Sequence, residues 1–305
     1  MGARVIRPGI AAVAQPMPGH PLGSSNCYLI ATDGGAIVVD PGYERPGTLR
    51  RIASGLASID RRLADVRTVV LTHHHRDHAE AAHAVRVHTG AAVAVHPADE
   101  GMPAVGVWGA TPGSPVPASW GVPAPLRTRM LARPPALVVH ADLDLAHGTA
   151  LATTQGAMRV VHTPGHTGGS ICLVIDDARV VLMGDHVLPD IHPGAGLGGR
   201  FAANPLLAYR ESLRAMGEYD GFVGLPGHGA PLHAVPRRAG QIARHHGRRT
   251  REVADVIAGH PDATVWELAR RVGWSGGFEA LDDGRMLSAL RQTFWHAQLA
   301  PRDGS

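Results

Sequence analysis

The chain has 305 residues, 44% of them apolar, and a formal net charge of only +3. This length allows one large buried core together with a smaller one. The small net charge gives little reason to expect a nucleic-acid partner, and no apolar run approaches the roughly 18 residues of a membrane span.

The cysteines and the N-terminal segment bear on the compartment. Cys27 and Cys172 are too few for a disulfide framework and no CxxC pair is present, so we expect two inert core thiols. The apolar stretch near the N-terminus is short and interrupted by proline, unlike a signal peptide. We therefore expect a cytoplasmic protein without a membrane partner.

The first 96 residues are predicted to combine strands with short helices. Two apolar runs flank Asp33 and Gly34, a dipeptide typical of a hairpin turn. Apolar residues at helical spacing predict a helix over 47–58. The later elements of this part are predicted strands over 66–72 and 91–96 and a helix over 79–90.

Residues 97–135 have a different composition. Proline and glycine are frequent, and Trp108 and Trp120 lie within the segment. Loops of this length in compact proteins are often functional lids, although a static surface excursion fits the composition equally well. The sequence leaves both interpretations open.

The rest of the chain is predicted to return to strands and then to become helical. The expected strands cover 136–145, 157–163, 170–176, 179–185 and 221–225, and the expected helices cover 205–217 and 236–258. In the tail, Thr264 and Glu267 have the spacing of a capping box, and a final helix over 283–299 is apolar on one side. We predict a large domain over 1–235 and a small helical domain over 236–305.

A histidine-rich cluster, "LTHHHRDH", directly follows the predicted strand over 66–72. Side chains alternate along extended backbone, so His73 and His75 point the same way and His74 points the opposite way. Asp77 and His78 fall where the chain turns into the next helix. Imidazoles and a carboxylate are ligands of zinc and similar divalent ions.

Three later segments repeat this pattern of an apolar strand, a glycine or proline turn, and a histidine or aspartate. They present His162 and His166 in "VVHTPGHT", Asp185 in "LMGDH" and His228 in "LPGHG". Strand ends that meet at one edge of a sheet form a cleft, and glycine allows the backbone to approach an ion closely. The four segments together predict one metal site.

These motifs resemble those of the metallo-β-lactamase superfamily, in the family's order and over about residues 5–235. The resemblance implies an α+β fold, a four-layer αββα sandwich with two metal ions at one edge of the sheets. It also assigns the ligands. One metal is expected on His73, His75 and His166, the other on Asp77, His78 and His228, and Asp185 is expected to bridge them.

The tail resembles the winged-helix-like cap of one branch of that superfamily, which includes hydroxyacylglutathione hydrolases. The implied chemistry is that of a dinuclear hydrolase, with Zn²⁺ expected and Mn²⁺ or Fe²⁺ as alternatives. A metal-bridging hydroxide would attack the carbonyl of a small-molecule ester, thioester or lactone. Asp77 is the expected catalytic residue, because its carboxylate would hold the proton and pass it to the leaving group.

Several residues near the motifs are expected to have supporting roles. Asp40 in "VVDPG" should hydrogen-bond the neighbouring turn, and His74 should support the ligands or pack behind them. His162 either orients a ligand or is an ordinary partly buried histidine. His186, next to Asp185, is a candidate for lining the pocket.

Two other functions remain open. The basic stretch over 237–253 would suit a metal-dependent ribonuclease or phosphodiesterase. The alternative, which we favour, is that the tail packs beside the mouth of the active site or forms a homodimer contact, and that these arginines are a solvated helix face. Redox chemistry on iron is the third interpretation, which the full set of second-metal ligands argues against. We therefore expect a small-molecule acyl substrate as the partner.

Overall fold

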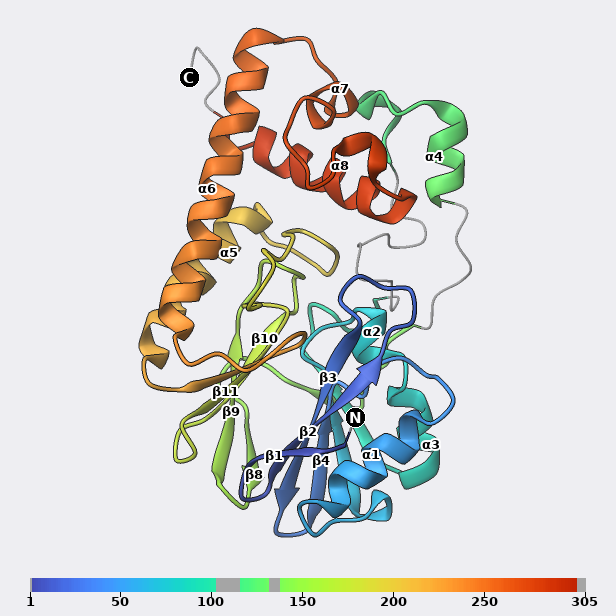
Figure 1. Ribbon diagram of the computed structural model, residues 1–305, viewed down its shortest axis with the longest axis vertical. Coiled ribbons are helices and arrows are strands. Elements are labelled where there is room, and N and C mark those ends of the chain that lie inside the picture. Colours follow the sequence, from blue (N-terminus) through green and yellow to red (C-terminus); the bar gives the residue numbers. More distant parts are fainter. Residues whose placement is uncertain (1, 103–115, 132–137, 301–305) are drawn as a thin grey trace.

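The protein, described by a computed structural model over residues 2–102, 116–131 and 138–300, contains two sheets with helices on their outer faces (Figure 1). The first sheet has seven strands in chain order: β1 (Arg4–Arg7), β2 (Ile10–Pro16), β3 (Ser24–Thr32), β4 (Gly35–Val39), β5 (Val66–Val70), β6 (Ala92–Val95) and β7 (Leu143–Asp144). The second sheet has five, in the order β12 (Val223–Pro226), β11 (Val180–Gly184), β10 (Ile171–Ile175), β9 (Gly156–His162) and β8 (Ala150–Thr153).

The strand pairing confirms much of the predicted pattern. β3 and β4 form the expected hairpin, with Thr32 opposite Gly35 across the Asp33–Gly34 turn. β4, β5, β6 and β7 are parallel neighbours, as are β11 and β12. The strand expected over 136–145 is shorter, because among its described residues only Leu143–Asp144 pair as a strand. Parallel pairing brings the C-terminal ends of several strands to the same edge of the sandwich.

The helices cover the sheets and continue into a C-terminal region. They are α1 (Thr48–Ala57), α2 (Arg76–Ala79), α3 (Ala82–Thr89), α4 (Ala124–Leu131), α5 (Pro205–Ala215), α6 (Val235–Gly259), α7 (Val265–Ala269) and α8 (Asp283–Ala297). Short 3₁₀ turns lie at η1 (Leu63–Asp65), η2 (Ala118–Trp120), η3 (Met216–Tyr219) and η4 (Phe278–Ala280). Among the described residues, no helix combines the length and apolar character needed to cross a bilayer.

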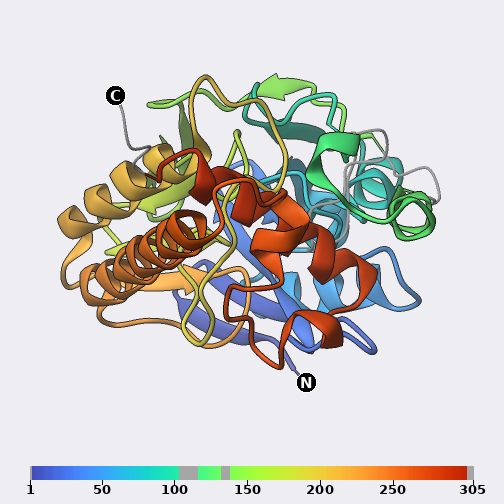
Figure 2. The ribbon, with the colours of Figure 1, turned by 90° about the horizontal axis from the view of Figure 1, so that it is seen from above.

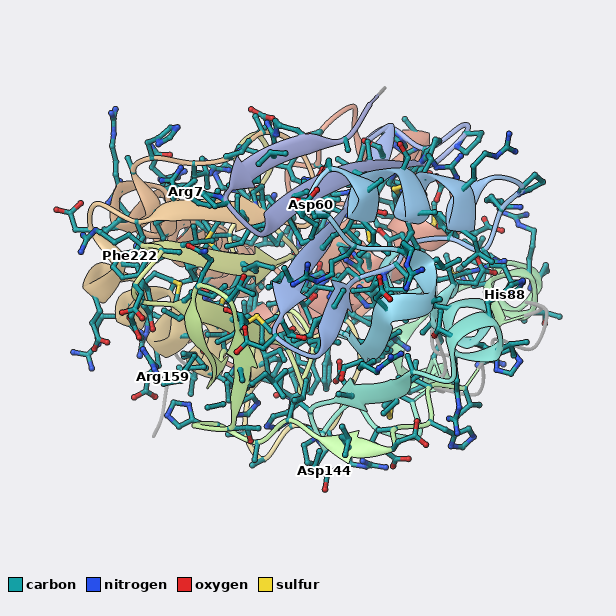
Figure 3. All side chains as sticks on the ribbon, turned by 90° about the horizontal axis from the view of Figure 1, so that it is seen from below. Arg7, Asp60, His88, Asp144, Arg159 and Phe222 are labelled. Atoms are coloured by element: carbon teal, nitrogen blue, oxygen red, sulfur yellow. The ribbon has the colours of Figure 1, made fainter. Side chains whose placement is uncertain are left out.

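Three apolar cores separate the four layers of the sandwich. Residues such as Ile52 and Val85 join α1 and α3 to the first sheet, and Ile30 and Leu173 lie between the sheets. Tyr209 belongs to the core between the second sheet and helices α5 and α6. Seen from below, His88 of α3 and Phe222, which precedes β12, mark opposite flanks of this stack (Figure 3). The four-layer αββα sandwich is thereby confirmed.

A fourth core joins the segment over 116–131 to the C-terminal helices. Trp120 is buried there, with its ring 5.1 Å from that of Phe294 on α8, and Met130 and Leu287 belong to the same core. Seen from above, α8 crosses over the ends of the strands (Figure 2). Residues 116–131 therefore pack against the tail. Trp108, the other tryptophan of the suggested lid, lies outside the described residues.

The C-terminal region is helical, as expected. The predicted capping box forms at the start of α7, where Thr264 and Glu267 hydrogen-bond each other's backbone N–H groups. The winged-helix comparison is not confirmed, because residues 235–300, all of them described, contain helices and no strand. The boundary near residue 235 stays a prediction, and it coincides with the first residue of α6.

The two cysteines are buried and free, as expected. Cys27 lies in β3 and Cys172 in β10. Burial raises the pKa of the Cys172 thiol to about 12 and raises that of Cys27 well above its ordinary value. Neither thiol is therefore ionised at neutral pH, which excludes both as nucleophiles in this conformation.

Candidate metal centre

The candidate metal centre lies at the edge of the sandwich that faces α8. Figure 1 shows α2, which carries Asp77 and His78, between the upper ends of the strands and the C-terminal helices. The other candidate ligands follow β5, β9, β11 and β12. All seven candidate ligands are almost completely buried: His73, His75, Asp77, His78, His166, Asp185 and His228.

The first group consists of the three histidines expected to share one metal. Nε2 of His166 lies 3.0 Å from Nδ1 of His75. The ring of His73 is centred 4.7 Å from that of His75 and 5.0 Å from that of His166. One ring nitrogen from each residue lies within 4.8 Å of the others, which is a suitable separation for ligands of one ion.

The second group contains Asp77, His78 and His228. Nε2 of His228 lies 3.3 Å from Nε2 of His78 and 3.1 Å from Oδ2 of Asp77. Oδ2 of Asp77 also lies 3.5 Å from Nε2 of His78. The structure thus brings together the residues expected on the second metal.

Asp185 lies between the two groups. Its Oδ1 is 3.4 Å from Nε2 of His78 and 3.5 Å from Nε2 of His228. Its Oδ2 is 3.7 Å from Nε2 of His166, in the first group. The two oxygens of one carboxylate therefore face different groups, which is the geometry that the expected bridging role requires.

Hydrogen bonds on the outer side of the histidines fix the orientation of their rings. The bonds join Nε2 of His75 to the carbonyl of Leu197 (2.9 Å), Nδ1 of His166 to the carbonyl of Gly194 (2.8 Å), Nδ1 of His78 to Oδ2 of Asp40 (2.9 Å) and Nδ1 of His228 to the carbonyl of Ser24 (2.8 Å). A ring that donates from one nitrogen keeps the lone pair of the other nitrogen free for a cation. In each ring the other nitrogen faces its group.

Buried polar atoms without partners test whether the site fits metal ions. In the described part of the chain, Nε2 of His73, both carboxylate oxygens of Asp77 and Oδ1 of Asp185 accept no hydrogen bond. Leaving such atoms unsatisfied in the interior is costly. Divalent cations at the two groups would satisfy Nε2 of His73, Oδ2 of Asp77 and Oδ1 of Asp185, which are atoms of the types that such ions prefer as ligands. The residues present therefore fit two metal ions.

The pKa directions agree with a site for cations. Burial and neighbouring histidines lower the pKa of His75 to about 3, so its imidazole is neutral. At His228 the effect of burial is outweighed by Asp185 and Asp77, which raise its pKa to about 10. The two buried carboxylates thus attract positive charge to the second group.

Asp40 has the predicted role and a further one. Its Oδ1 accepts the backbone N–H of Thr72 at 2.8 Å, and its Oδ2 accepts the Thr72 hydroxyl at 2.7 Å. The same Oδ2 lies against Nδ1 of His78. Asp40 therefore holds the turn that carries His73 and also orients His78, a candidate ligand of the second group.

Asp99 is a residue of the site that the sequence reasoning missed. Its side chain is fully buried, and Oδ2 accepts the backbone N–H of His74 (3.0 Å) and the hydroxyl of Thr167 (2.8 Å). Oδ1 accepts the N–H of Gly169 (2.7 Å), and Nδ1 of His74 lies 2.8 Å from Oδ2. Asp99 thereby ties the loop of His73 and His75 to that of His166. A signal existed, because "VAVHPAD" also runs from strand through proline turn to aspartate.

His74, His162 and His186 lie outside the two ligand groups. His74 points toward Asp99, as its supporting role required. His162 donates from Nε2 to the carbonyl of Gly168 (2.8 Å) and stacks on His96 at 3.8 Å, so it supports the loop of His166 from behind. His186 is buried, with its ring 5.3 Å from that of Tyr209.

A glycine allows the backbone to approach the centre after β12. A Cβ atom on Gly227 would lie 2.4 Å from Oδ1 of Asp185 and 2.7 Å from Cε1 of His78. The N–H of Gly227 also donates to the carbonyl of Gly184 at 2.6 Å. The position has no room for a side chain, which explains the glycine before His228.

Comparisons with known proteins agree with this geometry. The model of the metallo-β-lactamase superfamily matches residues 20–228. An uncharacterized protein of Mycobacterium leprae (strain TN) is 34% identical over 216 residues, which cover 69% of this chain and 90% of that protein. The atrochrysone carboxyl ACP thioesterase of Aspergillus chevalieri is 23% identical over 278 residues, covering 88% of this chain and 74% of that protein.

Solved structures show the same fold. A metallo-β-lactamase family protein from Thermus thermophilus is 26% identical and superimposes with a TM-score of 0.72, covering 96% of this chain and 93% of that one. A β-lactamase domain protein from Burkholderia ambifaria is 23% identical with a TM-score of 0.75, covering 97% and 88%. The chain therefore belongs to the metallo-β-lactamase superfamily and is a hydrolase of that family.

Proposed function

We propose that the protein is a dinuclear metal-dependent hydrolase acting on a small-molecule ester, thioester or lactone. The observation that carries this proposal is the position of Asp185, whose two oxygens face two separate groups of buried ligands. Imidazole and carboxylate donors suit zinc, with manganese or iron as alternatives. The first ion would be held by His73, His75 and His166, and the second by Asp77, His78 and His228.

The chemistry divides between the ions and the chain. When bound, two divalent ions polarise a carbonyl and make a water molecule acidic near neutral pH. Asp77 would hold the proton of the attacking water at Oδ1, since Oδ2 is the atom nearest His228 and His78. The same carboxyl would then donate that proton to the leaving group.

A carbonyl substrate is favoured over a phosphodiester by the relatives. One of them is named an acyl-carrier-protein thioesterase, which supports the thioester in our set of candidates. Trp120 is buried against α8, so it does not offer its ring to an acyl group. A lid over the substrate that uses this residue is therefore no part of the proposal.

The test is an assay of metal-stripped and metal-reloaded protein against thioesters, esters, lactones, β-lactams and RNA. We expect hydrolysis of at least one acyl substrate, its loss after chelation, and its return with Zn²⁺ or Mn²⁺. Full acyl hydrolysis by protein shown to contain no metal would contradict the proposal.

The ribonuclease alternative rests on one surface feature. Four exposed arginines follow one face of α6 at helical spacing: Arg237, Arg244, Arg248 and Arg251. Such a stripe would bind a phosphate backbone with steep salt dependence. RNA binding at low salt together with metal-dependent cleavage would favour this function over acyl hydrolysis. Absence of binding would remove it.

A further inference from the structure

The loop over 186–204, between β11 and α5, lies between the metal centre and the C-terminal helices. On one side, its carbonyls at Gly194 and Leu197 accept the ring N–H groups of His166 and His75. These are two of the three ligands of the first group. The position of this loop therefore determines the orientation of both imidazoles.

The other side of the same loop is held by α6. Arg238 donates from Nε to the carbonyl of Leu188 at 2.7 Å and from Nη2 to that of Ile191 at 2.5 Å. His246 donates from Nε2 to the carbonyl of Pro193 at 3.0 Å. The helix thus hydrogen-bonds the loop at three points over six residues.

Helix α8 also packs closely against the loop. A Cβ atom on Gly196 would lie 2.4 Å from Nε1 of Trp295, and one on Gly194 would lie 3.0 Å from Nε2 of Gln292. The amide of Asn204 donates to the carbonyl of Trp295 at 3.1 Å. With both helices packed against it, the loop has little room to shift.

His246 contacts the loop directly beside the carbonyl that binds His166. Pro193 and Gly194 are consecutive, and the carbonyl of the first accepts from His246 while the carbonyl of the second accepts from His166. His246 is buried, and burial with the neighbouring His245 lowers its pKa to about 3. A neutral ring that donates from Nε2 fits this position.

We propose that His246 is a positioning residue for the first metal: by fixing the carbonyl of Pro193 it aims that of Gly194 at His166. Through this contact the C-terminal helices influence the metal affinity of the first group. The inference rests on the proposed dinuclear function. It adds a residue outside the ligand motifs, on a helix beyond the segment that matches the family model.

The experiment measures zinc affinity of the full-length, metal-stripped chain by competition with a chromophoric chelator. In His246→Phe we expect one of two binding constants to fall about 10- to 100-fold and the other to stay as in wild type. His246→Gln, whose amide retains a donor at the Nε2 position, should recover most of this loss. The protein His166→Ala, lacking a ligand of the first group, identifies which constant belongs to that group.

A matched control lies one turn along the same helix. The hydroxyl of Thr250 is 2.9 Å from Nδ1 of His296 on α8 and makes no hydrogen bond to the loop. The same hydroxyl donates to the backbone carbonyl of His246 at 3.1 Å. Thr250→Val therefore removes contacts of α6 without removing the hydrogen bond between the His246 imidazole and the loop, and we expect both zinc affinities to be unchanged. Should His246→Phe not fold, His246→Asn replaces it, because its shorter amide does not reach Pro193.

The outcomes separate this inference from the proposed function. Unchanged affinities in the folded His246 variants, or an equal loss in Thr250→Val, would overturn the inference and leave the dinuclear site intact. A wild-type chain that binds no zinc, or a single ion, would contradict the dinuclear function and with it this inference. Cobalt absorption spectra of the same variants give a second readout, which should change in His246→Phe and recover in His246→Gln.

Discussion

Asp185 is the residue at which the two ligand groups meet. Replacing it by asparagine keeps the shape of the side chain and removes its charge. Because the negatively charged carboxylate that faces both groups becomes a neutral amide, we expect metal affinity to fall at least about 10-fold and turnover about 100-fold or more. Metal content after dialysis and initial rates on the best acyl substrate check this.

The control for this substitution is Asp176→Asn, at an exposed carboxylate that pairs with Arg159 at the far end of β10. It should bind metal and turn over as wild type does. Two tightly bound ions and normal rates in Asp185→Asn would show that the carboxylate does not join the groups.

Asp99 makes a prediction about acid stability. Its carboxylate is buried, yet His74, Thr167 and Gly169 lower its pKa from 3.8 to about 2. Because the pKa of this carboxyl is lower in the folded than in the unfolded protein, its charge stabilises the fold at pH values above the unfolded-state pKa. This stabilisation is lost as the pH falls through the folded-state pKa. The shift is worth about 2 kcal/mol at neutral pH and about half of that near pH 3.

Urea unfolding of metal-free wild type and Asp99→Asn over a pH series measures this effect. The stability difference between the two proteins should be largest at neutral pH and should shrink as the pH falls from about 4 toward 2. A difference that does not vary with pH would mean that the charge of Asp99 contributes nothing.

Turns at strand ends are the elements that bring the ligands together. Gly227 has no room for a Cβ atom beside Asp185 and His78, whereas Gly217 has open space around it. Gly227→Ala should therefore displace two ligands and weaken metal binding about 10-fold or more, while Gly217→Ala should not. Titration with zinc distinguishes the two, and equal affinities would show that the close approach is unimportant.

The sequence predicted which side chains lie together in the candidate metal centre, because their positions follow from local rules. A strand that ends in a glycine or proline turn delivers its next polar side chain to the edge of the sheet, as at His166, Asp185 and His228. The carbonyls of Gly194 and Leu197 escaped prediction, because a backbone group has no sequence signature of its own. Asp99 follows a strand and a proline turn like the candidate ligands, but its partners Thr167 and Gly169 are distant in sequence, so its role could not be predicted.

For the whole molecule, the sequence suggested a small helical domain that packs beside the mouth of the active site or forms a dimer contact, but not which segment shares its core. Contacts between residues far apart in the sequence join the segment over 116–131 to α7 and α8 in one core. This core is distinct from the three cores of the sandwich. Helical periodicity showed the apolar side of α8 and left its partner open. The winged-helix resemblance is not confirmed, because it was based on the pattern of helices and a few aromatic residues, which does not specify strands.

Trp120 tests the independence of this fourth core. Trp120→Ala should lower the free energy of unfolding of this core by about 3–5 kcal/mol, because removing the buried side chain leaves a large cavity. Amide hydrogen exchange should then quicken in α7 and α8 while the strands of the sandwich keep their protection. Leu207→Ala, at an exposed leucine of α5, is the control, and equal loss of protection in β10 and β11 would show a single cooperative unit.

The positions of bound zinc ions show directly whether the two groups form a dinuclear centre. Crystals of zinc-loaded protein, measured by anomalous diffraction at the zinc edge, should show two peaks. One is predicted among His73, His75 and His166, the other among Asp77, His78 and His228, and Asp185 should contact both. A single peak, or zinc bound elsewhere and not by these seven side chains, would contradict the dinuclear centre.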